Sequence, residues 1–241
     1  MTVDNIRPVP KKAKAKETHS SHLILRHTHD TCKSFLDAFE SVRKARGASD
    51  TPTDDEQDLL RAMLLFASAG LDSMVKQLIR DTLPKVIDKD LGAHKEFEQF
   101  ATRELAMKSI DSTLNAADVK TLACIIVQDS PKHALLARLL RSLTSDSLQS
   151  AEQLLRVASH FGIIAQEVYK DLSKLRQVFD IRNRIAHEMD IDFTQRNRKR
   201  FPRRKIDMIN HTNTLLVAAD NFLRAVDKKV SSTSLSSPTS P

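Results

Sequence analysis

The residues best suited to chemistry lie near the end of one helical segment, in the stretch DIRNRIAHEMD at 180–190. Arg182 can grip phosphate oxygens with its planar guanidinium, and Asn183 can orient a phosphate or an imidazole ring. His187 can accept or donate a proton near neutral pH, because the unperturbed pKa of histidine is about 6.5. Together these three side chains can hold a phosphate group and move a proton beside it.

A helical wheel places Arg182 among apolar residues. The apolar side chains of its segment fall on one arc of the helix: Leu175, Val178, Phe179, Ile185, Ala186 and Met189. Arg182 falls in the middle of this arc, and Asn183 and His187 lie on its flank, one turn apart. A guanidinium there costs free energy unless it is paired or opens onto a cleft or an interface. Two interpretations stay open: a structural arginine paired with a buried carboxylate, or a site. Arg184 and Glu188 are expected to form an i, i+4 ion pair that points away.

The composition predicts a helical protein. The chain of 241 residues has only four Gly, one Tyr and no Trp, and it is rich in Leu, Ala and charged residues that favour helix. No segment alternates at period two, and no Asn-Gly or Asp-Gly hairpin signal is present. We therefore predict an all-α fold, built as an up-and-down helical bundle.

Apolar periodicity, capping residues and prolines set the expected helix boundaries. Thr53 and Glu56 form a capping-box pattern before the most apolar helix, which we expect to end at Pro84. Pro131 fits the first turn of a short helix, and Gly162 stands near the end of another. The other expected helices span 23–46, 92–110, 116–127, 165–189 and 207–229.

Both terminal segments lack a pattern for burial. Residues 1–20 combine prolines with alternating lysines, which predicts a flexible basic tail. Residues 230–241 are a low-complexity Ser/Thr/Pro segment, which predicts a disordered tail. Between them we expect one helical domain over residues 21–229, with inserted helices over about 90–143.

The segment from Arg182 to His187 resembles the Arg-x4-6-His motif of the HEPN superfamily (higher eukaryotes and prokaryotes nucleotide-binding domains). Asn183 matches the polar residue that many members carry after the arginine. The setting is similar as well, because the motif ends a long helix and is followed by a loop and one more amphipathic helix. Upstream, LDSMVKQL resembles the Glu/Asp-x3-Lys element of many members, which here is Asp72 and Lys76.

This resemblance covers about residues 54–84 and 147–229, and it leaves the first helix and the insert unaccounted for. It implies a HEPN-type bundle that forms a homodimer, with the two Arg-His motifs in one cleft. It further implies a metal-independent endoribonuclease acting as a toxin or in phage defence, with an antitoxin protein as a further partner. Some members have lost nuclease activity, so a non-catalytic RNA- or nucleotide-binding module is the alternative. A purely protein-binding bundle is a third.

RNA cleavage of this kind suits the residue types in the motif. The ribose 2′-OH is the nucleophile, so the protein supplies a base, an acid and positive charge, without a metal or another cofactor. We expect Arg182, Asn183 and His187 to be catalytic. Asp72 is expected to orient Arg182 or His187, with Lys76 beside it; an intrahelical Asp72–Lys76 ion pair is the structural alternative.

A basic segment, RNRKRFPRRK at 196–205, follows the motif. Its cations have no acidic residue among them, so they are expected to bind RNA phosphates in a salt-dependent manner; they are Arg196, Arg198, Lys199, Arg200, Arg203, Arg204 and Lys205. A solvated surface loop is the alternative. Phe201 is its only aromatic residue, so base stacking is not strongly indicated. The net charge of +7 agrees with a polyanionic partner.

The remaining features predict location and exclude some site classes. The two cysteines, Cys32 and Cys124, and the lack of a secretory leader predict a reduced, cytoplasmic location. No apolar run reaches the roughly 18 to 20 residues that span a bilayer, so we expect no membrane partner. The histidines near the N-terminus lack acids or cysteines at ligand spacing, so we expect no metal site; they are His19, His22, His27 and His29.

Overall fold

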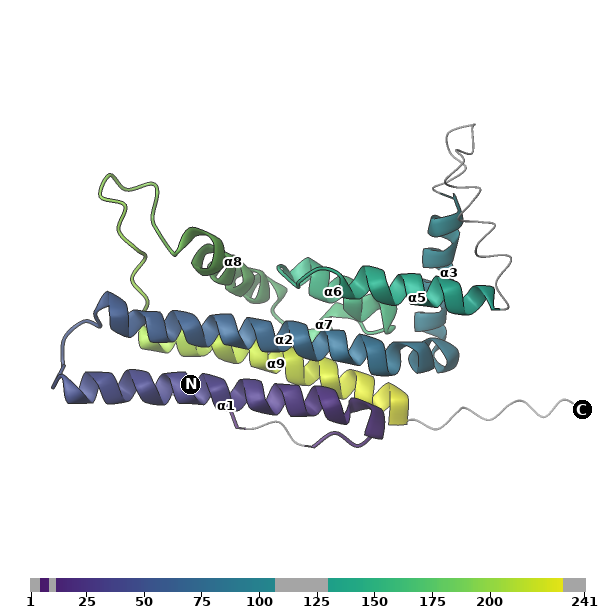
Figure 1. Ribbon diagram of the computed structural model, residues 1–241, viewed down its shortest axis with the longest axis horizontal. Coiled ribbons are helices and arrows are strands. Elements are labelled where there is room, and N and C mark those ends of the chain that lie inside the picture. The colour runs from purple at the N-terminus through teal and green to yellow at the C-terminus, as the bar shows by residue number, and fades with distance from the viewer. Residues whose placement is uncertain (1–4, 9–11, 107–129, 232–241) are drawn as a thin grey trace, which may run out of the picture.

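The computed structural model describes residues 5–8, 12–106 and 130–231 (Figure 1). Within these residues every regular element is a helix, apart from one isolated β-bridge between Ile191 and Arg200. The prediction of an all-α fold is therefore confirmed. The helix expected over 116–127, and residues 232–241 of the expected C-terminal tail, lie outside the described residues.

Three long helices lie side by side and form the body of the molecule (Figure 1). They are α1 (His19–Ala45), α2 (Asp54–Lys89) and α9 (Lys205–Ser231). α2 packs against both of the others. Shorter helices occur between α2 and α9 in the chain: α3 (Leu91–Ala106), α5 (Pro131–Thr144), α6 (Ala151–His160), α7 (Ala165–Val168) and α8 (Leu172–Glu188). α5, α6, α7 and α8 lie on the side of α2 and α9 that faces away from α1 (Figure 1).

α2 is the central helix of the core. The Thr53 side chain accepts from the Glu56 backbone N–H, and the Glu56 side chain accepts from the Thr53 N–H, so the expected capping box is present. The helix does not end at Pro84 as expected but continues to Lys89. Val86 and Ile87 are each only 1% exposed, and their burial outweighs the backbone hydrogen bond that the proline removes.

The helix expected over 165–189 is broken into α7 and α8. Tyr169 is extended, with a φ of −157°, and Asp171 caps the new helix by accepting from the Lys174 backbone N–H at 3.0 Å. Asn221 of α9 donates its side-chain amide to the Val168 carbonyl at 3.1 Å. The Val168 carbonyl, which the break leaves without a partner in the helix, thus accepts from a residue distant in sequence. Apolar periodicity within the segment does not reveal this contact.

The described part of the N-terminal segment is not the flexible tail that its composition predicts. Ile6 is buried, and Asn213 of α9 binds the backbone of this segment at Arg7. Asp227 of α9 accepts from the Lys14 and Ala15 backbone N–H groups. Burial alone raises the pKa of Asp227, but these hydrogen bonds lower it overall. Buried polar side chains on α9 therefore hold a segment that has no apolar periodicity of its own.

α2 also meets the length and hydropathy criteria of a membrane-crossing helix. It has 36 residues, and the mean hydropathy of its most apolar window is 1.3, whereas the sequence analysis expected no such segment. Half of that window is buried inside the bundle. A core helix that packs against its neighbours passes the same test, and α2 packs against both α1 and α9.

Candidate functional site

The buried face of α8 determines where the candidate motif points. Leu175 and Val178 are fully buried, and Arg182 is half-buried on the same face, as the wheel indicated. Ala186 and Met189, which the wheel also placed on this face, are exposed instead. Met189 lies just beyond the end of α8 and has a left-handed φ of 52°, so the wheel does not describe its direction. Ala186 lies in the last turn of α8 and is exposed there.

Arg182 is partly desolvated and partly unpaired. Its Nη1 donates to the Asn183 Oδ1 at 2.8 Å, and its Nε is enclosed without a hydrogen-bond partner among the described residues. Burial lowers the pKa of Arg182, and the charge of Asp72 opposes this effect. The Arg182 guanidinium is therefore partly desolvated, and its enclosed Nε is a donor that no acceptor among the described residues uses.

Asp72 and Asn183 both hold the loop that joins α5 to α6. Asp72 Oδ1 accepts from the Leu148 backbone N–H at 2.9 Å, and its Oδ2 pairs with Lys76 at 3.0 Å. The Asn183 side-chain amide donates to the Gln149 carbonyl at 2.8 Å. The intrahelical Asp72–Lys76 ion pair is thus present, and the carboxylate binds a backbone amide rather than either member of the Arg-His motif.

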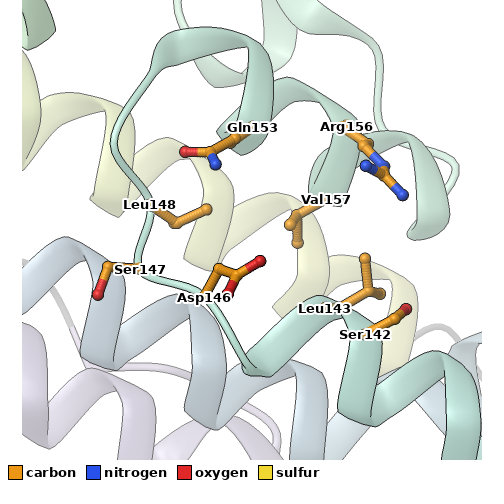
Figure 2. Close-up of a pocket in the computed structure, with 8 residues that line it drawn as sticks. All are labelled: Ser142, Leu143, Asp146, Ser147, Leu148, Gln153, Arg156 and Val157. Carbon is orange, nitrogen blue, oxygen red and sulfur yellow. The ribbon is translucent and has the colours of Figure 1, made fainter.

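A small pocket lies between α5 and α6, beside this loop (Figure 2). It is lined by Ser142, Leu143, Asp146, Ser147, Leu148, Gln153, Arg156 and Val157. Its volume of about 70 Å³ is room for about two water molecules, which is too little for a nucleotide. None of the predicted site residues lines it, so we do not place the site there.

His187 is exposed at the end of α8 and makes no hydrogen bond or ion pair with the described residues. It lies one turn beyond Asn183, at the i, i+4 spacing. Arg182 and His187 are five positions apart, which separates their directions around the helix by about 140°. The structure therefore brings Arg182 and Asn183 together and leaves His187 pointing into solvent.

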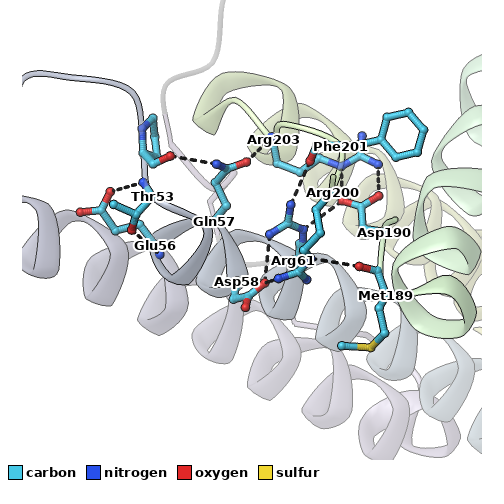
Figure 3. A network of polar contacts seen from close by, with 11 residues as sticks. Thr53, Glu56, Gln57, Asp58, Arg61, Met189, Asp190, Arg200, Phe201 and Arg203 are labelled. Carbon is cyan, nitrogen blue, oxygen red and sulfur yellow. Dashed lines mark hydrogen bonds and ion pairs between the residues drawn. The ribbon is translucent and has the colours of Figure 1, made fainter. Parts of the chain in front are cut away.

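The loop after α8 is held by a buried carboxylate that the sequence analysis left without a role (Figure 3). Asp190 is fully buried, and its Oδ2 accepts from the Arg61 Nε at 2.9 Å and from the Arg203 Nε at 2.7 Å. Arg61 of α2 also donates to the Phe201 carbonyl at 2.9 Å. The Asp190 carboxylate thus joins α2 to both ends of the loop between α8 and α9, which contains the basic segment and which we call the basic loop.

The predicted RNA-binding cations fall into two groups. Four of them have internal partners: Arg203 binds Asp190, Arg200 binds Asp58 and the Met189 carbonyl, Arg204 pairs with Asp207, and Lys205 pairs with Glu40. Arg196, Arg198 and Lys199 are exposed and have no ion pair among the described residues. We call these three the unpaired loop cations. Arg200 and Arg203 hold the loop in place through their internal partners. The unpaired loop cations are therefore the ones among the predicted RNA-binding residues whose charge has no partner within the described part of the chain.

Arg184 does not form the expected ion pair with Glu188. Its guanidinium lies over the Phe201 ring, 4.6 Å from the ring centroid, and Arg203 lies 5.7 Å from the same ring. The basic loop folds back on α8 and offers this aromatic face. Arg184 therefore contacts the Phe201 ring in place of the exposed i, i+4 ion pair with Glu188, which would contribute only about 0.5 kcal/mol.

One sequence signal pointed to the buried network and was missed. Arg61 stands in the most apolar helix, in DLLRAMLL, and it is only 2% exposed. A buried arginine requires a carboxylate partner; Arg61 pairs with the half-exposed Asp58 three residues before it and with the buried Asp190, which is 129 residues away in the chain. A buried carboxylate partner was considered for Arg182 only, whereas Arg61 is the arginine that has one.

Among the described residues, no three His, Cys, Asp or Glu side chains are grouped so that they could hold a metal ion. The chain matches no protein-family model, no curated protein and no solved structure.

Proposed function

We propose that this protein is a metal-independent endoribonuclease of HEPN type. The observation that carries the proposal is the partly desolvated Arg182 guanidinium, whose Nε lacks a partner among the described residues and whose Nη1 is held by Asn183. The exposed His187 lies on the next turn, and the three unpaired loop cations follow it in the chain. In this proposal Arg182 binds the phosphate, His187 transfers the proton and the loop cations attract RNA, all at the C-terminal end of α8.

The proposed reaction uses the ribose 2′-OH as the nucleophile. A histidine removes its proton, the oxygen attacks the adjacent phosphorus, and the bond to the 5′ oxygen breaks as that oxygen receives a proton. Arg182 stabilises the charge on the non-bridging oxygens. The products are a 2′,3′-cyclic phosphate and a 5′-hydroxyl. The toxin or phage-defence role and the antitoxin partner belong to the same proposal through the resemblance alone.

A homodimer completes this site, because one chain offers a single histidine that points away from Arg182. Ala186 and Met189 are exposed beside His187, and Met189 is 62% exposed, so an apolar contact is available along α8. We predict a homodimer packed along residues 166–189, measured by light scattering. A monomer at tens of micromolar protein would contradict this prediction.

The assay for the proposed function is incubation of the purified protein with end-labelled RNA in EDTA. Cleavage that persists in EDTA and leaves cyclic phosphate ends supports the proposal. Products with 5′-phosphate ends, or cleavage that EDTA abolishes, contradict it.

The second candidate is a non-catalytic RNA-binding module. The observation that favours it is the lack of any hydrogen bond from His187 to the described residues, since catalytic histidines are usually oriented by a partner. RNA binding in EDTA without any cleavage, by the dimer as well as the monomer, would select this candidate.

The unpaired loop cations are expected to account for part of the salt dependence of RNA binding. Replacing Arg196, Arg198 and Lys199 with Ser should reduce the slope of log affinity against log salt by about 2 to 3, since each phosphate contact contributes about 0.7 to 0.9. The matched control replaces three exposed cations of α1 that also lack ion pairs among the described residues: Arg26, Lys33 and Lys44. If the slope falls equally in the control, the loss of net charge explains the whole effect, and the loop has no specific part in RNA binding.

A further inference from the structure

Phe193 is an exposed aromatic residue in the loop that follows α8. Its side chain is 59% exposed, whereas its neighbour Asp192 is 7% exposed. A ring that is exposed to this extent gains only part of the free energy that full burial would give, so most of its apolar surface remains open to a partner. The sequence prediction of weak base stacking rested on Phe201 alone, so Phe193 was not among the predicted site residues.

The backbone that carries Phe193 is well fixed. Asp192 accepts from the Thr194 hydroxyl at 2.6 Å and from the Thr194 backbone N–H at 3.0 Å. The Asp192 N–H donates to the Lys199 carbonyl at 2.9 Å, and the Phe201 N–H donates to the Asp190 carbonyl at 2.9 Å. The ring is therefore presented by a braced loop, so that binding to it would cost little conformational entropy.

The Phe193 ring differs from two other partly exposed phenylalanines in what lies against it. Phe201 is covered by Arg184 and Arg203, and Phe66 packs against Phe35 with ring centroids 5.1 Å apart. Phe193 has no cation or aromatic ring against it among the described residues. Its ring is thus available to a planar group from outside the chain.

The surroundings of Phe193 indicate what that planar group is. The same loop carries the three unpaired cations, and a hollow in it is lined by Gln195, Arg196 and Asn197. Unpaired cations in the same loop as an exposed ring disfavour an apolar protein surface as the partner, because they would be desolvated without a counter-charge. A single-stranded nucleic acid supplies both a phosphate for the cations and an unpaired base for the ring.

We propose that Phe193 is a base-stacking platform for single-stranded RNA, placed beside phosphate contacts from the unpaired loop cations. This inference rests on the RNA binding in the proposed function, and it does not require cleavage. Stacking on a phenylalanine tolerates any base, so the platform favours unpaired segments over duplex RNA without reading a sequence.

The first experiment measures the affinity for a single-stranded oligoadenylate with 2′-O-methyl riboses, which cannot be cleaved by 2′-OH attack. Phe193→Ala should weaken binding between about 5-fold and 150-fold, the usual range for loss of one stacked base. The slope of log affinity against log salt should stay unchanged, because no charge is lost. Phe193→Tyr should restore binding, and Phe66→Ala is the matched control because Phe66 is 51% exposed elsewhere.

The second experiment uses the absence of Trp from the chain. Phe193→Trp introduces a single indole at the proposed platform, and the oligoadenylate should quench its fluorescence, whereas Phe66→Trp should not respond. An oligomer with abasic sites should bind the wild type more weakly by the same factor that Phe193→Ala loses. The Phe193→Ala variant should bind the abasic oligomer and the intact oligomer with equal affinity.

These outcomes separate the stacking proposal from the nuclease proposal. Quenching together with a lack of cleavage on unmodified RNA would overturn the nuclease and leave the platform standing. Unchanged affinity in Phe193→Ala, or no binding of the oligomer by the wild type, would overturn the platform. A shift in the emission of Phe193→Trp with protein concentration alone would assign the ring to an interface between two copies and would also overturn it.

Discussion

Replacing His187 with Ala is expected to lower the rate of RNA cleavage in EDTA between about 100-fold and 10,000-fold, the usual contribution of a general acid or base. The side chain is exposed and makes no hydrogen bond with the described residues, so the free energy of unfolding should change by less than about 0.5 kcal/mol. Cleavage of labelled RNA and urea unfolding are measured on the same preparation. His133→Ala is the matched control, since it removes another exposed histidine from α5.

Arg182→Ala tests the same site from its phosphate side. The expected rate loss is about 100-fold to 1,000-fold, comparable to the removal of one oxyanion donor. Its stability cost should be about 1 kcal/mol, since one hydrogen bond to Asn183 is lost and the guanidinium Nε has no partner to leave behind. A loss of several kcal/mol with a parallel fall in melting temperature would show a structural arginine. A wild-type rate in His187→Ala would refute the catalytic assignment.

Asp190→Ala is expected to destabilise the protein by about 3 to 5 kcal/mol, measured by urea unfolding at neutral pH. The substitution leaves two guanidiniums close together, and the Arg61 side chain is 2% exposed and cannot reach water. It also removes the group that joins α2 to the loop carrying Phe193, so affinity for single-stranded RNA should fall as well. Asp146→Ala is the control, because Asp146 is exposed and has no ion pair among the described residues.

A second substitution identifies the source of that loss. In Asp190→Ala, Arg61 keeps its ion pair with the half-exposed Asp58 and loses the buried one. If the cost comes from this loss of a buried counter-charge, adding Arg61→Met to Asp190→Ala should recover part of the stability. A loss below about 1 kcal/mol in Asp190→Ala would mean that the network is dispensable. Equal losses in the single and double variants would trace the cost to loop packing instead of charge.

Several elements of the fold could be predicted from the sequence because their causes are local. The capping box of Thr53 and Glu56 lies within four residues, and the start of α5 at Pro131 follows from the geometry of proline itself. The half-burial of Arg182 also followed from periodicity, since the apolar face of α8 packs against α2 and α9. Helix formation depends on hydrogen bonds and side chains within one or two turns, so the printed sequence carries most of this information.

Only the tertiary structure decided which polar groups distant in the sequence meet. Arg61 pairs with Asp190 across 129 residues, and Asn221 supports the break before α8 from 53 residues away. The same packing pairs Arg203 of the basic loop with Asp190 and leaves Phe193 exposed. The partner of a charged or polar group depends on which helices the whole chain brings into contact, and burial makes an unpaired group costly. The sequence by itself therefore determined where the helices form and which residues have chemical capacity, whereas the packing of distant helices decided which of those residues hold the fold and which remain free to bind.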